Sequence, residues 1–164
     1  MKNLTAVVLF LVPTLAFAAD GPVGLGSNGG KFGDWTAASY GSGAGKACYA
    51  FVAASHSDPV LKKRGDVMLT VTQRHGASDE VTLSAGYTYP AKAVVTLTVG
   101  SSTIDFYTQG GTAFTVSGKD AVAAFKNGAT AEAKSSAPGG KTVTDDFSLS
   151  GFSGAYGAIT AACP

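Results

Sequence analysis

The chain has 164 residues, with 12 basic and 11 acidic side chains and a formal net charge of +1 at pH 7. This near-neutral balance argues against nucleic acid as a partner, because phosphate binding needs a surplus of basic residues on one face. The length fits one domain with a hydrophobic core of its own.

The first segment predicts a secretory signal peptide at residues 1–18. Lys2 precedes an apolar run over residues 4–17, and Ala16-Phe17-Ala18 fits the small-residue rule for signal cleavage. The run is shorter than the roughly 20 apolar residues that a membrane-spanning helix needs. We therefore expect an exported protein that keeps no transmembrane segment after cleavage.

The two cysteines, Cys48 and Cys163, allow a single pairing. They form either one bridge or two free thiols, and the oxidising compartments that an exported chain enters favour the bridge. Neither cysteine lies in a Cys-x-x-Cys setting of the kind that redox enzymes use. We therefore predict a structural disulfide that closes most of the domain into one loop.

The rest of the chain is predicted to be a glycine-rich flexible leader, residues 19–31, followed by a single β-rich domain, residues 32–164. Short apolar and polar alternations, separated by Gly, Pro, Asn or Asp, are typical of antiparallel strands. The predicted strands cover residues 34–40, 46–53, 66–73, 80–85, 94–99, 102–107, 111–116, 129–135 and 141–149.

One predicted hairpin has a register that can be read from the sequence. A two-residue turn at Gly100-Ser101 places Leu97 opposite Ile104 and Val95 opposite Phe106 on the same face. The alternate positions carry polar residues, so this hairpin is expected to cover a core on one side only.

Two helices are predicted in the C-terminal half. Ser117 with Asp120 resembles a capping box, and Asn127-Gly128 supplies a stop signal. Over residues 151–162, apolar side chains recur at helical spacing. The predicted fold class is therefore mainly β, an antiparallel β-sandwich or barrel-like fold with one or two short α-helices near the C-terminal half.

A search for catalytic residues yields one string, Gly151-Phe152-Ser153-Gly154-Ala155, which partly resembles a nucleophile elbow. Its base would have to be His56 or His75. The string departs from the elbow pattern at its last position, and a glycine-rich junction between a strand and a helix is the simpler interpretation. We predict no catalytic residue and keep a small exported serine hydrolase as an alternative.

The remaining polar clusters predict no metal site and no cofactor. Two histidines are too few for a metal site at defined spacing, and no glycine string has the phosphate-loop pattern. Asp145 and Asp146 are neighbours on a strand, so they point to opposite faces and do not converge on a substrate. The cluster Lys62-Lys63-Arg64 lies beside Asp58 and Asp66 and is interpreted as a solvated loop in preference to a patch for an anionic ligand.

Tyrosines supply the one candidate interaction surface. Tyr87 and Tyr89 lie together in a loop before Pro90, and tyrosine is enriched at recognition sites. We take this pair as the candidate contact surface for a protein or an envelope component.

Landmarks that keep their order along the domain resemble a known family, the invasion associated locus B proteins. The matching landmarks are Phe32-Gly33-Asp34-Trp35, Lys46 to Cys48-Tyr49, Lys63-Arg64-Gly65-Asp66, Gly86-Tyr87, Phe147-Ser148-Leu149, Gly151-Phe152 and Ala162-Cys163. The resemblance implies a β-rich fold with a cysteine pair and a place in the periplasm or on the outer surface of a Gram-negative bacterium. It implies no catalytic residues.

The family is named for a member linked to the entry of a pathogen into red blood cells. The resemblance therefore predicts an exported, envelope-associated protein that acts through binding or through interaction with the host or the cell surface, without catalysis. Besides the hydrolase, a β-barrel that holds a small apolar ligand stays open as an alternative.

Overall fold

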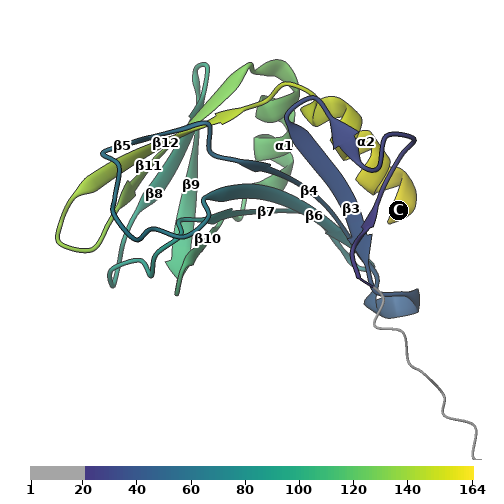
Figure 1. Ribbon diagram of the computed structural model, residues 1–164, viewed down its shortest axis with the longest axis horizontal. Coiled ribbons are helices and arrows are strands. Elements are labelled where there is room, and N and C mark those ends of the chain that lie inside the picture. Colours follow the sequence, from purple (N-terminus) through teal and green to yellow (C-terminus); the bar gives the residue numbers. More distant parts are fainter. Residues whose placement is uncertain (1–20) are drawn as a thin grey trace, which may run out of the picture.

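The computed structural model describes residues 21–164 (Figure 1), so the predicted signal peptide lies outside the described residues. The described part is one antiparallel sheet of twelve strands with two α-helices, α1 (Gly118–Asn127) and α2 (Phe152–Ala162). This confirms the predicted fold class. Within residues 21–164, no helix is both long enough and apolar enough to cross a membrane.

Nine strands coincide with the predicted ones, and three were not predicted. The strands are β1 (Val23–Gly24), β2 (Lys31–Phe32), β3 (Trp35–Tyr40), β4 (Ala47–Ala53), β5 (His56–Asp58), β6 (Met68–Arg74), β7 (Ala77–Ser84), β8 (Val95–Val99), β9 (Ser102–Gln109), β10 (Thr112–Phe114), β11 (Thr130–Ser136) and β12 (Thr142–Ser148). The unpredicted strands are β1, β2 and β5. A short 3-10 helix, Gly43–Gly45, joins β3 to β4.

The expected flexible leader is instead attached to the sheet. β1 and β2 both pair with β3, the Leu25 amide donates to Ala37 O at 2.9 Å, and the Ala37 amide donates to Gly30 O at 2.7 Å. These contacts use backbone groups, which every residue carries. The side chains of the leader therefore did not indicate that its backbone would pair with β3.

The sheet bends until its two halves meet. Its order is β1-β3-β4-β6-β7-β10-β9-β8-β11-β12-β5, so β4 and β5 lie far apart in the sheet although only residues 54 and 55 separate them in the chain. The Ser55 amide donates to Asp146 O at 2.8 Å, which ties the link between these strands to β12. The result is a strongly bent, barrel-like sheet (Figure 1). Its buried side chains form the hydrophobic core.

The predicted hairpin is confirmed in its register. Between β8 and β9, Val95 faces Phe106 and Leu97 faces Ile104, and all four side chains are buried. Gly100 has a φ of +57° in the turn between the strands, a conformation that glycine adopts without strain.

Helix α1 ends as predicted but begins differently. Gly128 follows its last residue. However, the Ser117 side chain makes no capping hydrogen bond, because its φ of −104° and ψ of 49° lie outside the extended region that capping requires. The Ser117 amide instead donates a hydrogen bond to Thr115 Oγ1, two residues earlier in the chain, at 3.1 Å. The capping-box prediction is therefore wrong.

Helix α2 and helix α1 enclose an aromatic cluster over one part of the sheet. The ring of Phe152 lies 4.8 Å from that of Trp35 and 5.3 Å from that of Phe125, and all three residues are buried. The Trp35 indole also donates to Ser148 O at 2.9 Å, so its one polar atom is satisfied. Figure 1 shows α2 near one end of the molecule, the β11–β12 hairpin at the other, and α1 between them.

The disulfide forms as predicted. Cys48 on β4 and Cys163, the residue after α2, have Cα atoms 5.9 Å apart and are 115 residues apart in sequence. Beside the bridge, Lys46 Nζ donates to Ala162 O at 3.0 Å and places a positive charge at the C-terminal end of the helix. Both contacts attach the tail of the chain to the sheet.

Replacing Cys48 and Cys163 together by Ala should lower the free energy of unfolding by about 2–5 kcal/mol, because the unfolded chain regains the freedom that a long loop closure removes. Urea denaturation of the wild type and the double variant measures this loss, and reduced wild type serves as the control. Native protein whose sulfurs react with iodoacetamide without a reductant would contradict the bridge.

Candidate functional site

Three loops gather at the end of the sheet away from the helices. We call this region the loop end: residues 59–67 between β5 and β6, residues 85–94 between β7 and β8, and residues 137–141 between β11 and β12. Strand register places them together. Asp58 pairs with Thr144 near the start of β12, and Ser135 near the end of β11 pairs with Val95 at the start of β8.

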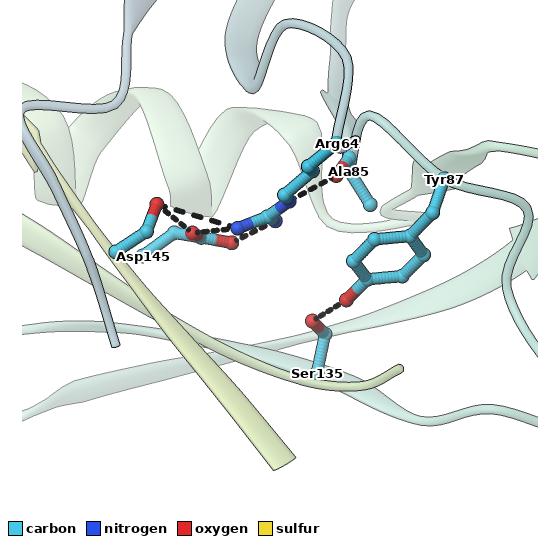
Figure 2. A network of polar contacts seen from close by, with 6 residues as sticks. Arg64, Ala85, Tyr87, Ser135 and Asp145 are labelled. Carbon is cyan, nitrogen blue, oxygen red and sulfur yellow. Dashed lines mark hydrogen bonds and ion pairs between the residues drawn. The ribbon is translucent and has the colours of Figure 1, made fainter. Parts of the chain in front are cut away.

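A buried ion pair holds this region from inside (Figure 2). Arg64 Nη1 and Nη2 donate to the two carboxylate oxygens of Asp145, each at 2.7 Å. The side chains are 7% and 0% exposed, respectively. A bidentate pair of this kind fixes the orientation of the guanidinium as well as its position.

The other atoms of Arg64 and Asp145 are also used. Arg64 Nε donates to Ala85 O at 2.6 Å, and the Ser57 hydroxyl donates to Asp145 Oδ1 at 2.6 Å. The adjacent Gly65 amide donates to Gly86 O at 2.8 Å. Loop 59–67 is thereby joined to strand β5, to strand β12 and to loop 85–94.

The charge of Asp145 favours the protonated form of Arg64. Burial alone would lower the pKa of Arg64, but the hydrogen bonds and charge of Asp145 outweigh burial and raise that pKa above its ordinary value. Because the two charges neutralise each other, the Arg64 guanidinium is not free to bind an anion. We call the Arg64–Asp145 pair the lock, since it holds the loops in place.

Tyr87 belongs to the same cluster (Figure 2). The Arg64 guanidinium carbon lies 5.0 Å from the centre of the Tyr87 ring, within the range of a cation–π contact. The Tyr87 hydroxyl lies 2.8 Å from Ser135 Oγ on β11. Tyr87 is half-buried, and these two contacts tie loop 85–94 to loop 59–67 and to β11.

Tyr89 lies inside the protein, which corrects its prediction as part of a contact surface. Its side chain is buried at 6% exposure, with its ring edge-on to that of Tyr87 at 5.5 Å. The physical reason is the backbone: the Tyr89 amide donates to Gly110 O at 2.9 Å and draws the loop onto the β9–β10 turn. Its hydroxyl finds no hydrogen-bond partner among the described residues.

Sequence reasoning missed Arg64 and Asp145 as partners. Arg64 was interpreted with Lys62 and Lys63 as a solvated cluster; the two lysines are exposed, whereas Arg64 is turned inward. The prediction that Asp145 and Asp146 point to opposite faces agrees with the burial of Asp145 and the partial exposure of Asp146. An arginine beside lysines was the available signal, because arginine is the cation suited to a buried bidentate pair.

The structure does not assemble the alternative hydrolase site. Ser153 lies on the first turn of α2, whereas Arg74 and Gly76, which flank His75, line a hollow with Thr160 and Cys163 at the other end of that helix. Seven residues of helix span about 10 Å. His56 lies on β5, and no hydrogen bond between Ser153 and either histidine occurs in the described part.

Between two of the loops lies a shallow hollow of about 450 Å³. Its walls are small or apolar, with Pro90 on one side and Pro138 on the other, and Lys92 lies on its rim. Within residues 21–164, no group of three or more His, Cys, Asp or Glu side chains is arranged to hold a metal ion.

Replacing Asp145 by Ala should cost about 3–5 kcal/mol in the free energy of unfolding, because Arg64 would stay buried without a counter-charge. A double variant, Arg64→Met with Asp145→Leu, should recover much of that loss. Glu80→Ala, which removes the exposed partner of Arg74 at 3.6 Å, is the control and should cost less than about 1 kcal/mol. Equal losses for Asp145→Ala and Glu80→Ala in chemical denaturation would refute the lock.

The buried phenol of Tyr89 should make the folded protein less stable at alkaline pH. Burial, followed by the nearby Tyr87 and Asp145, raises the pKa of the Tyr89 phenol above its ordinary value of 10.0. The folded state therefore holds this proton more tightly than the unfolded state, so the contribution is complete below pH 10 and is lost as the pH rises above it.

When the pH is raised from neutral to above 10, the free energy of unfolding should fall less in the Tyr89→Phe variant than in wild type, because phenylalanine has no proton to release. At neutral pH it should be equally stable, or more stable by about 1–2 kcal/mol, since the hydroxyl has no partner among the described residues. Denaturation curves at both pH values measure the difference, and identical alkaline losses in the two proteins would contradict the argument.

Comparisons with known proteins agree with this architecture. Residues 35–160 match the model of the family described as invasion associated locus B (IalB) protein. The crystal structure of invasion associated protein b from Bartonella henselae is similar, with a TM-score of 0.59 and 21% sequence identity over 80% of this chain and 95% of that chain. No curated protein matches the chain. The family match spans most of the sequence, and the chain therefore belongs to the invasion associated locus B family.

Proposed function

We propose that this protein is exported to the cell envelope and acts there by binding, through the loop end, without catalysing a reaction. The observation that carries the proposal is the Arg64–Asp145 lock. It fixes the bases of loops 59–67 and 85–94, while the tips of the three loops are left exposed. Because the ion pair fixes the conformation of exposed loops, we infer that this conformation matters for binding.

Export is supported by two features that are independent of each other. The disulfide between Cys48 and Cys163 is of the kind that persists in oxidising compartments. The sequence of residues 1–18 has the pattern of a secretory signal. Membership of the IalB family is consistent with an envelope-associated role, in the periplasm or at the outer surface of a Gram-negative bacterium.

The binding surface is better sought at the loop tips than at the tyrosines. Tyr89 is buried and the half-buried Tyr87 contacts Ser135, so substituting either would change the support of the loops as well as any recognition. The tips carry four exposed lysines: Lys62, Lys63, Lys92 and Lys141. Exposed side chains can be changed with little effect on the fold, which makes these positions suitable for a test.

Two measurements test the proposal. Cell fractionation should recover the protein, shortened by its signal peptide, in the envelope or periplasmic fraction. Immobilised wild type should retain components of an envelope extract, and Lys63→Glu with Lys92→Glu should retain less, because the charge at the tips is reversed. Lys119→Glu with Lys126→Glu, which makes the same change of charge on helix α1, is the matched control.

The proposal would be wrong if the full-length chain stayed in the cytoplasm. It would also be wrong if the loop-end variant and the α1 control retained the same components in the same amounts as wild type.

A further inference from the structure

We infer that the loop end docks on an anionic lipid surface, with its lysines at the lipid phosphates and its apolar tips among the headgroups. This inference rests on the proposed function and names the partner of the same site. It is carried by the composition of the tips, by their charge, by the backbone of two lysines and by the rigidity of the support.

Each loop places an exposed apolar residue close to a lysine. In loop 59–67, Val60 is 83% exposed and precedes Lys62 and Lys63. In loop 85–94, Val94 is 64% exposed and follows Lys92. A basic side chain beside an exposed apolar one suits the boundary between lipid headgroups and acyl chains, where the stem lies in apolar surroundings and the charge stays in water.

The third loop and a neighbouring strand continue the pattern. In loop 137–141, Pro138 is exposed and Lys141 follows three residues later. Tyr107 on β9 is 56% exposed, and the register that pairs Phe106 with Val95 puts Tyr107 beside Val94. Tyrosine is enriched where proteins meet the headgroup layer, because one end of its ring is apolar and the other is polar.

The charge of the loop end is positive in a chain whose overall charge is near zero. In the loops and the adjoining end of β5, four exposed lysines outnumber two exposed carboxylates, Asp58 and Asp66, and Asp105 on β9 adds a third. Arg64 adds nothing to the outer field because Asp145 neutralises it. Basic residues near an anionic leaflet are attracted to it individually, so a cluster of this size has a measurable effect.

Two of these lysines occupy a backbone conformation that glycine would hold more easily. Lys63 and Lys92 have φ values of 61° and 60°, in the left-handed region. Thirteen other positions with positive φ are glycine, and Asp79 is the one remaining exception among the described residues. No side-chain hydrogen bond or ion pair inside the described fold accounts for a lysine at either position, so we take these side chains to be used outside the fold.

The same tips fit a lipid surface better than a protein partner. The centres of protein interfaces are enriched in aromatic residues and arginine and depleted in lysine. Here the tips offer lysine, valine and proline, while the arginine and two tyrosines of the region are turned inward. A single phosphate would need converging donors, whereas these lysines are distributed over three loops.

The test uses the exported protein with its disulfide intact, sedimented with vesicles. Vesicles of phosphatidylcholine mixed with an equal part of phosphatidylglycerol should bind wild type, and added salt should weaken the binding. Vesicles of phosphatidylcholine alone should bind it much less. Inorganic phosphate should compete no better than chloride at the same ionic strength.

The informative variant is Lys63→Gly with Lys92→Gly. Relief of left-handed strain and the greater freedom of glycine in the unfolded chain oppose each other, so its melting temperature should stay within a few degrees of wild type. Its affinity for the anionic vesicles should fall roughly 25-fold, about fivefold for each lysine. The control Lys119→Ala with Lys126→Ala removes the same charge from α1 and should bind like wild type.

The apolar contribution is tested separately by Val60→Ser with Val94→Ser. This variant should bind the anionic vesicles less well at both low and high salt, because it removes no charge. Equal binding of wild type to neutral and anionic vesicles, or an equal loss in the α1 control, would overturn the inference.

Failure of this inference can be distinguished from failure of the proposed function. If wild type ignores both kinds of vesicle but retains an envelope protein through Lys63 and Lys92, the lipid partner is wrong and the binding function stands. If it retains neither lipid nor envelope protein, both are wrong.

Discussion

The architecture depends on one buried carboxylate, Asp145, which needs a cation as its partner. Asp145 points into the bent sheet and is fully buried, and a carboxylate in that position is stable only when a cation with good geometry meets it. Arg64 supplies that cation from a loop 81 residues earlier in the chain. Loop 59–67 must therefore fold inward, and in doing so it brings β5, β12 and loop 85–94 to one place.

Two fastenings of different chemistry act at opposite ends of the molecule. The disulfide joins β4 to the tail behind α2, close to the aromatic cluster of Trp35, Phe125 and Phe152. The ion pair joins loop 59–67 to β12. The helix end is thus held by a covalent bond and by apolar packing, whereas the loop end is held by directional polar contacts. Directional contacts suit a region where the exact placement of exposed side chains matters, since they fix orientation as well as proximity.

Patterns in the sequence predicted those features of the fold that depend on neighbouring residues or on composition. Alternation located nine strands, the Gly100-Ser101 turn set the β8–β9 register, and a count of two cysteines gave the bridge. The leader strands escaped because backbone pairing leaves no side-chain signature. The Arg64–Asp145 lock escaped for a different reason: it joins residues that are 81 positions apart, and its one local signal was an arginine among lysines, which does not identify the partner. The burial of Tyr89 likewise depends on its contact with Gly110, which a tyrosine in a polar loop does not reveal.

Three residues other than glycine have a positive φ, and they differ in whether their side chains make contacts inside the fold. Asp79 accepts hydrogen bonds from Gln73 and Tyr156, each at 2.8 Å, so contacts inside the fold account for its conformation. Lys63 and Lys92 have the same strain, yet their side chains make no hydrogen bond or ion pair with another described residue. Strain persists only where something over-determines it. For Asp79 the side-chain contacts help to hold that conformation, whereas for Lys63 and Lys92 the folded loops alone hold the backbone, which leaves both side chains available for the lipid contact that we propose.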